Sequence, residues 1–310
     1  MATPLERASA AVAPASAPAF APPPSRWFRL LRRDPFAAAS LVLLVVLVAC
    51  AVLGPWLLGD AGTRQNLRLR NAPPLSIQHG WLYVLGADTL GRSMLGRLIL
   101  ASRNTLTIAA AAVAGSLVVG AALGLLAGYA RGWVGDLVLR LTDIVMSFPS
   151  LLMAVVILYM FEPSVLNVVL VLAITRLPVY IRTTRAEVLE LKQRSFVSAA
   201  KVMGASPVRI ALRHVLPMVV PTLTTLATVE FAYVMLAESG LSFLGIGIQP
   251  PEVSWGLMVA QGRNYLGTAW WLAFLPGLAI MLTTLAINLA ASWLRVATDP
   301  QQRWRLEGLR

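Results

Sequence analysis

Residues 196–217 of this 310-residue chain read FVSAAKVMGASPVRIALRHVLP, and two incompatible structures fit this stretch. Ala200, Gly204, Ser206 and Ile210 occur at the spacing of a helix-turn-helix that reads DNA. The same residues fit a short basic loop between two membrane-spanning helices. The residues on either side decide between these interpretations, and with them the fold class.

The composition favours a membrane protein. The chain is 57% hydrophobic and 13% charged, with a mean hydropathy of +0.71, whereas soluble domains carry about 25% charged residues. The net charge of +12 fits either a nucleic-acid partner or cytoplasmic loops. The positions of the charges must therefore distinguish the two.

Several apolar segments are long enough to cross a bilayer, which takes about 20 residues per helix. The fourth is the weakest, because Arg176 and Pro178 fall in its last two turns. The second carries Gly120, Gly124 and Gly128, a spacing that lets a neighbouring helix pack closely. The predicted fold class is an all-α polytopic membrane protein with six transmembrane helices, at residues 37–58, 104–129, 137–160, 164–181, 215–237 and 269–296.

Basic residues predict the orientation. The segments that lie inside when the N-terminus is cytoplasmic carry 18 Lys and Arg, and the outer segments carry seven. This excess predicts that both termini are cytoplasmic. The first outer loop opposes the trend with six arginines, which an amphipathic helix over residues 89–103 lying on the membrane would explain.

These spans divide the chain into parts with different expected properties. The N-terminal part is rich in Ala and Pro without apolar periodicity, so we expect it to be disordered. The parts are a cytoplasmic tail (1–35), a first transmembrane helix (36–58), a periplasmic loop (59–103), a membrane core (104–296, including a loop at 182–217) and a cytoplasmic tail (297–310).

The loop at 182–217 has its own predicted structure. Leu189, Phe196, Ala200 and Met203 share one face of a helix, and Gly204 ends it. A second helix then begins with Ser206 as N-cap and Pro207 in its first turn. Its predicted apolar face consists of Val208, Ala211, Leu212 and Val215.

The position of this loop excludes a DNA reader. A DNA-binding module needs a third helix and a core of its own, and only about 33 residues separate the two flanking spans. The second helix also runs directly into the membrane. Pro217 lacks an amide hydrogen, so we expect a kink between this helix and the fifth span.

The loop resembles the EAA loop of ABC import permeases. In that family Glu-Ala-Ala is followed by three residues, Gly, nine residues, Ile, one residue and Leu-Pro. Here Ser198 stands where glutamate is common and His214 where isoleucine is common. The stretches RRDPFAAASLVLL, LGADTLGRSMLGRLILASRNTL, GWVGDLVLRLTDIVMSFPSLLMAVVI and ESGLSFLGIGIQPPEVSWG resemble the second permease subunit of dipeptide/oligopeptide/nickel importers, in the binding-protein-dependent transport inner-membrane component family.

This resemblance implies a subunit of a bacterial inner-membrane importer that is not itself an enzyme. Its implied partners are a second, homologous permease subunit, two ABC ATPases, an extracytoplasmic binding protein and membrane lipid, with no nucleic acid. The sequence contains no GxxxxGK[ST] phosphate loop. ATP and Mg²⁺ would therefore bind the ATPases, and this subunit would need no cofactor.

The resemblance also implies which residues couple the subunit to the ATPases, and small side chains suit such a docking contact. They are Ser198, Ala199, Ala200, Gly204, Arg209, His214, Leu216 and Pro217. The implied cargo is a dipeptide or oligopeptide, with a nickel chelate or glutathione as alternatives in the same family. A stand-alone secondary transporter is an alternative of another class, and the absence of a detectable internal repeat opposes it.

Charged residues within spans usually face a cavity or a partner. Glu230 would either meet a peptide's amino terminus or basic side chain, or bind within the protein, by pairing with an arginine such as Arg176 or by a hydrogen bond to another helix. We favour a partner within the protein. Glu238 is expected to order an outer gate. Asp143 and Arg140 lie one helical turn apart, which predicts a local ion pair.

No metal or catalytic site is expected. Cys50 is the sole cysteine, His79 and His214 lie far apart in sequence, and no HExxH or GxSxG motif occurs. Trp255, Trp270 and Trp271 fit either interfacial anchors or a docking surface for the binding protein.

Overall fold

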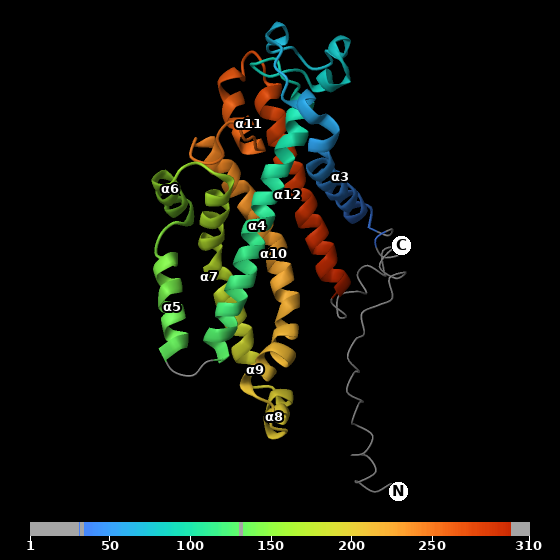
Figure 1. Cartoon of the computed structure of the whole chain (residues 1–310). Helices are drawn as coiled ribbons and strands as arrows, with labels where there is room; N and C mark the ends of the chain where they lie inside the picture. Colours follow the sequence, from blue (N-terminus) through green and yellow to red (C-terminus); the bar gives the residue numbers. More distant parts are fainter. Residues whose placement is uncertain (1–30, 32–33, 130–132, 299–310) are drawn as a thin grey trace, which may run out of the picture.

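The computed structural model describes residue 31 and residues 34–129 and 133–298, which form helices and connecting turns without a β-strand. The predicted all-α fold class is confirmed for these residues. The helices form an elongated bundle with a layer of short elements at one end (Figure 1). Five are long and apolar enough to cross a membrane: α3 (Pro35–Leu58), α4 (Met94–Tyr129), α7 (Val165–Leu191), α10 (Leu216–Phe243) and α12 (Trp271–Thr298).

The predicted third span is broken. Residues 137–160 belong to two helices, α5 (Trp133–Met146) and α6 (Ser150–Met160), with an 85° bend between them. The predicted third span therefore consists of two helices joined by a sharp bend, and not of one continuous helix. The cause is Pro149, which precedes α6: its ring removes an amide hydrogen and disfavours helical backbone at Phe148.

The predicted fourth span, by contrast, is one helix. α7 contains Pro178 without ending there and continues past the predicted end at residue 181 to Leu191. The basic stretch after residue 181, which the sequence assigned to a loop, thus begins as an extension of this helix.

The contact predicted from the glycine spacing is confirmed. A Cβ built on Gly120 would lie 2.5 Å from Tyr180 Cβ, and one on Gly124 would lie 2.6 Å from Thr184 Cβ. Gly128 meets Val188 Cγ1 in the same way at 2.7 Å. The three glycines of α4 therefore let the backbones of α4 and α7 approach closely over several turns.

An outer layer packs on one end of the bundle. It consists of η1 (Gly59–Gly62), η2 (Leu67–Leu69), η3 (Ile77–His79), η4 (Trp81–Leu85), α11 (Trp255–Gly262) and η6 (Arg263–Tyr265). The predicted surface helix at 89–103 does not form, because α4 already begins at Met94. Arg97 lies buried within that helix and binds Asp88 at 2.8 Å, so it is not a membrane-surface arginine.

Two of the three tryptophans assigned to anchoring or docking lie inside this layer instead. Trp255 is buried and donates from Nε1 to Leu98 O at 2.9 Å. Trp271 is also buried and donates to Ala87 O at 3.2 Å. Both side chains fix the outer layer to the bundle; Trp270 is the exposed one of the three.

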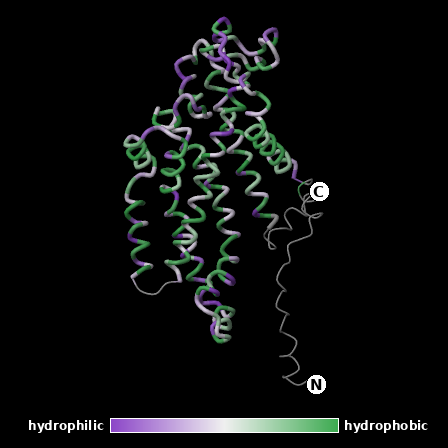
Figure 2. Tube along the Cα trace, in the orientation of Figure 1, coloured by the Kyte–Doolittle hydropathy of each residue, from purple (hydrophilic) through white to green (hydrophobic). Residues whose placement is uncertain are grey.

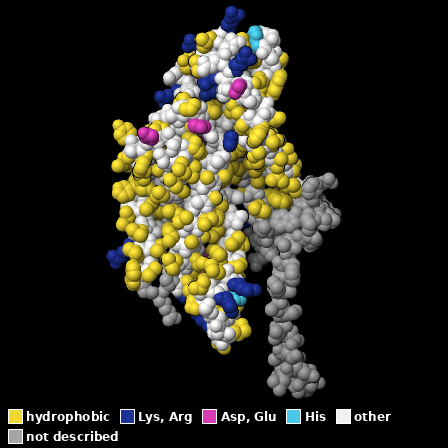
Figure 3. Space-filling model, viewed as in Figure 1, with side chains coloured by type: hydrophobic (Ala, Val, Ile, Leu, Met, Phe, Trp, Pro, Cys, Tyr) yellow, Lys and Arg dark blue, Asp and Glu magenta, His cyan; other side chains and the backbone are white. Residues whose placement is uncertain are grey.

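Polarity follows the long axis of the molecule. Hydrophilic residues concentrate at the two ends of the helical bundle, and its middle is largely hydrophobic (Figure 2). On the face shown in Figure 3, hydrophobic side chains cover most of the middle and most Lys and Arg lie near the ends. This layering matches a bundle that spans a bilayer.

Candidate coupling and translocation site

The loop at 182–217 forms the tip of the bundle opposite the outer layer (Figure 1). It contains α8 (Ser195–Val202) and α9 (Pro207–Ile210), joined by a turn in which Gly204 has φ +78°. Ser206 Oγ accepts a hydrogen bond from Arg209 N at 3.4 Å, and Pro207 occupies the first turn of α9. The predicted helix end and helix start are both confirmed.

The helix predicted to run from Leu189 to Met203 is, however, two helices. α7 ends at Leu191, and a turn separates it from α8, which begins at Ser195. Leu189 and Met203 therefore do not share one helical face as the spacing suggested.

Near the kink predicted at Pro217, the helix changes its winding without being interrupted. A wide π-helical turn, η5 (Ala211–Val215), joins α9 to α10, and the chain is helical from Pro207 to Phe243. Pro217 lies in the first turn of α10. Proline is tolerated in the first turn of a helix, where its missing amide hydrogen breaks no hydrogen bond. The wider π turn at residues 211–215 comes directly before that turn.

The predicted coupling residues differ in exposure. Ser198, Ala199, Gly204, Arg209, His214 and Pro217 are exposed, and Leu216 is partly buried. Ala200 is buried in a core that includes Val197 and Ile210. It therefore seats α8 on its own bundle and is not part of the exposed tip.

Apolar side chains that the sequence reasoning missed dominate the tip. Val202 is 89% exposed, Met203 79% and Val208 67%. The helical spacing placed Met203 and Val208 on buried faces, but the reversal of the chain at Gly204 leaves them outside. Clustered exposed apolar residues mark a surface for another molecule.

Lys192 ties this loop to the end of α4. Its Nζ donates to Gly128 O at 3.1 Å and Tyr129 O at 3.3 Å, and lies 5.1 Å from the centre of the Tyr129 ring. A cation at these last carbonyls also stabilises the negative end of the helix dipole. Movement of the tip is thus linked to α4 as well as to α10.

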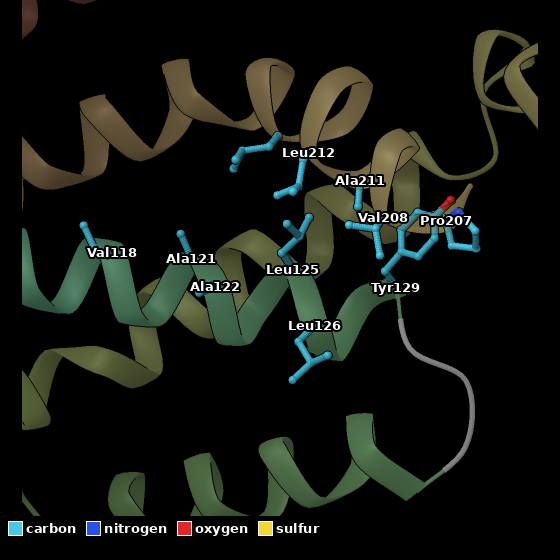
Figure 4. A pocket seen from close by; sticks show the side chains of 11 residues that line it. Val118, Ala121, Ala122, Leu125, Leu126, Tyr129, Pro207, Val208, Ala211 and Leu212 are labelled. Atoms are coloured by element: carbon cyan, nitrogen blue, oxygen red, sulfur yellow. The ribbon is translucent and has the colours of Figure 1, made fainter. Parts of the chain in front are cut away.

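A groove lies beside the tip, between the C-terminal part of α4 and residues 207–216 (Figure 4). It has a volume of about 640 Å³. Its lining is apolar apart from Tyr129, and Val118, Leu125, Val208 and Leu212 contribute to its walls. Such a surface offers no charged group to hold a polar cargo.

Charged residues instead meet midway along α7 and α10. Arg176 Nη1 lies 3.6 Å from Glu230 Oε2, which confirms the favoured partner within the protein. The Arg176 guanidinium also lies 4.1 Å from the centre of the Tyr233 ring. The Tyr233 hydroxyl is 3.1 Å from Ser150 Oγ at the start of α6.

The other two acidic residues discussed in the sequence analysis, Asp143 and Glu238, lie elsewhere. Asp143 pairs with Arg182 of α7, so the predicted partner Arg140 was wrong; the contact depends on helix packing and not on spacing within α5. Glu238 is fully buried and accepts a hydrogen bond from Ser242 Oγ at 2.8 Å. Ser242 Oγ in turn accepts from Ile248 N at 3.2 Å, which joins the outer end of α10 to the turn after it.

Comparison with known proteins places this geometry in a family. A family model described as "Binding-protein-dependent transport system inner membrane component" matches residues 120–304. A second, described as "N-terminal TM domain of oligopeptide transport permease C", matches residues 25–74.

Relatives match over most of their length. "Di/tripeptide transport system permease protein DppC" of Pseudomonas aeruginosa is 39% identical, covering 93% of this chain and 96% of that protein. "Glutathione transport system permease protein GsiD" of Pectobacterium atrosepticum is 35% identical, covering 89% of this chain and 90% of that protein. "Probable D,D-dipeptide transport system permease protein DdpC" of Escherichia coli is 33% identical over 88% of this chain and 90% of that protein.

The fold is also similar to a solved structure. A chain of the inward-facing MetNI methionine ABC transporter aligns with a TM-score of 0.55 at 17% identity, covering 70% of this chain and 98% of that chain. Together, the helical tip, the layered bundle and these matches show that the chain belongs to the family of binding-protein-dependent transport system inner-membrane components, as a multi-pass permease subunit.

Proposed function

We propose that this subunit forms half of an import pathway for peptides and couples it to cytoplasmic ATPases. The observation that carries the proposal is the helical run from Pro207 to Phe243. It connects the exposed apolar tip to Glu230 in the middle of the membrane. From Arg209 to Glu230, a helix spans about 30 Å at 1.5 Å per residue.

The tip is the proposed contact with one of two ATPases, and a second, homologous permease subunit would contact the other. Ser198, Ala199, Gly204 and Arg209 lie on its exposed side, beside Val202 and Met203. His214, Leu216 and Pro217 follow in the segment that carries movement into α10. Closure of the ATPases would displace this segment, and the π turn at 211–215 is the place where the helix bends.

The proposed orientation places both termini in the cytoplasm and the outer layer toward an extracytoplasmic binding protein. The hydrogen bonds that lead from Glu238 through Ser242 to Ile248 support a role for Glu238 in ordering the outer gate, because Ser242 holds the end of α10 against the following turn. Glu230 contributes to the pathway. ATP and Mg²⁺ bind to the ATPases, and this subunit carries no cofactor in the proposal.

Peptides are proposed as cargo because relatives named as dipeptide and di/tripeptide permeases match nearly the whole chain. The test is uptake by proteoliposomes containing the subunit, the second permease and both ATPases, with the binding protein added outside. We expect accumulation of labelled dipeptide that requires both ATP and the binding protein. Uptake without the ATPases would identify a secondary transporter, and uptake restricted to glutathione or a nickel chelate would contradict the proposed cargo.

A further inference from the structure

The contact between Arg176 and Glu230 is unusual for a structural ion pair. Both residues lie near the middle of their helices, α7 and α10, and each side chain is almost nine-tenths buried. Their shortest charged contact is 3.6 Å, which is too long for a hydrogen bond. A buried ion pair repays its desolvation only when its geometry is good and its remaining polar atoms are hydrogen-bonded.

Polar atoms around this pair lack partners. Glu230 Oε2, Arg176 Nε and the Tyr180 hydroxyl are buried and have no hydrogen-bond partner among the described residues. Tyr180 follows Arg176 by one helical turn, so it lies on the same side of α7. Buried polar groups are normally satisfied, so three unsatisfied ones beside one ion pair require an explanation beyond the contacts within this subunit.

The pair also adjoins a surface that another molecule can reach. Tyr233, whose ring lies against the Arg176 guanidinium, is 42% exposed. Its hydroxyl contacts Ser150 where the bend between α5 and α6 ends. A ligand that contacts the exposed side of Tyr233 would therefore be separated from the Arg176 guanidinium by a single side chain.

We infer that Arg176 and Glu230 form a binding site in the pathway for a zwitterion, with Arg176 holding a carboxylate and Glu230 an ammonium group. This inference rests on the proposed function, and it specifies the chemistry that the pathway selects. A ligand with one charge would release one residue of the pair and leave the other buried without a counter-charge, which is strongly unfavourable. A molecule with both charges compensates both residues, and a peptide with free ends is such a molecule.

The test separates a binding role from a structural one. In the complete reconstituted complex, the double variant Arg176→Met/Glu230→Gln removes both charges at once. Replacing a buried pair by hydrophobic side chains of similar volume is often neutral for folding; Met meets this condition at residue 176, and Gln keeps the shape of Glu230 without its charge. We expect uptake of L-alanyl-L-alanine to fall by about tenfold or more, since each charged hydrogen bond lost to the ligand weakens binding by about that factor. ATP hydrolysis stimulated by the binding protein should persist.

The matched control is Asp143→Asn/Arg182→Gln, which removes an ion pair that also involves α7 but lies exposed. We expect its uptake to stay close to that of the unmodified complex. Uptake by the Arg176→Met/Glu230→Gln complex at the unmodified rate would overturn the inference and leave the proposed function standing. If the unmodified complex imports no peptide with free amino and carboxyl termini, both the inference and the proposed function are contradicted.

Single variants keep the inference testable if the double variant does not assemble. Glu230→Gln preserves shape and loses charge, whereas Glu230→Asp preserves charge. We expect uptake to be lower with Gln than with Asp. Equal uptake by the two variants would show that the carboxylate charge at residue 230 does not act on the cargo, and would overturn the inference.

Discussion

Gly204 determines the direction in which the tip leaves α8. Its φ of +78° lies in the left-handed region, and a Cβ there would have no atom within 4 Å. The strain of any substitution is therefore conformational, about 1–2 kcal/mol for a residue with a Cβ. The local sequence predicted this turn correctly because the requirement for glycine is a property of one residue's backbone.

We predict that Gly204→Val uncouples uptake from ATP hydrolysis while the complex still assembles. The reoriented turn would displace Val202 and Met203 from their contact with the ATPase. The measurement is the number of peptides imported per ATP hydrolysed in proteoliposomes. Gly267→Val is the control, since Gly267 is also in open space but lacks a positive φ. An unchanged ratio in Gly204→Val would contradict the prediction.

Asp88 is the residue whose side chain stabilises the outer layer through several hydrogen bonds. Its carboxylate accepts hydrogen bonds from Leu90 N, Arg92 N and Arg92 Nε, and binds the buried Arg97. Asp88→Asn would leave Arg97 without its counter-charge, so we expect a loss of about 3–5 kcal/mol of stability. Thermal unfolding in detergent measures it, with the exposed Asp60→Asn as control. Identical midpoints for the two variants would show that this pair does not stabilise the layer.

At the scale of elements, replacing glycine by alanine in α4 should have opposite effects on stability at two positions that face α7. Gly124→Ala would place a Cβ 2.6 Å from Thr184 Cβ and 2.7 Å from Ile181 O, so α4 and α7 must separate. Gly115→Ala would place its Cβ 3.8 Å from Ala173 Cβ, an ordinary contact. We expect Gly124→Ala to destabilise the protein by about 1–3 kcal/mol, and Gly115→Ala to be neutral or stabilising because alanine favours helix. Thermal unfolding of both variants checks the sign, and equal shifts would contradict it.

Prediction from sequence was uneven at this scale. Apolar length located the five long helices, because a bilayer demands about 20 apolar residues per crossing. It misplaced their ends, since α4 and α7 continue beyond their apolar segments. Hydropathy does not locate a helix end when a charged residue in the helix, such as Arg97, has a counter-charge in a neighbouring element, because the helix can then continue through a polar stretch.

Across the whole molecule, the exposed tip is the surface that requires a partner. We predict that Val202→Ser/Met203→Ser weakens the association with the ATPases without changing the stability of the subunit, because both side chains are already exposed. Each lost burial of such a side chain removes about 1.5–3 kcal/mol from the interface. Co-purification with the ATPases measures the effect. Leu67→Ser removes a side chain of the outer layer that is 68% exposed and is the control; equal recovery of ATPase with both variants would place the contact elsewhere.

The sequence by itself determined the membrane class, the approximate place of the spans and the turn at Gly204, and it favoured a partner within the protein for Glu230, with Arg176 as a candidate. These follow from hydropathy, from the conformational demands of single residues, and from the high cost of an uncompensated charge in a membrane. Residues 196–217 thus kept their predicted helix–turn–helix shape. Tertiary structure alone decided that Ala200 faces inward and Met203 outward, that Asp143 binds Arg182, and that Trp255 is buried. The reason is that each of these depends on how helices distant in sequence pack together, which no local pattern encodes.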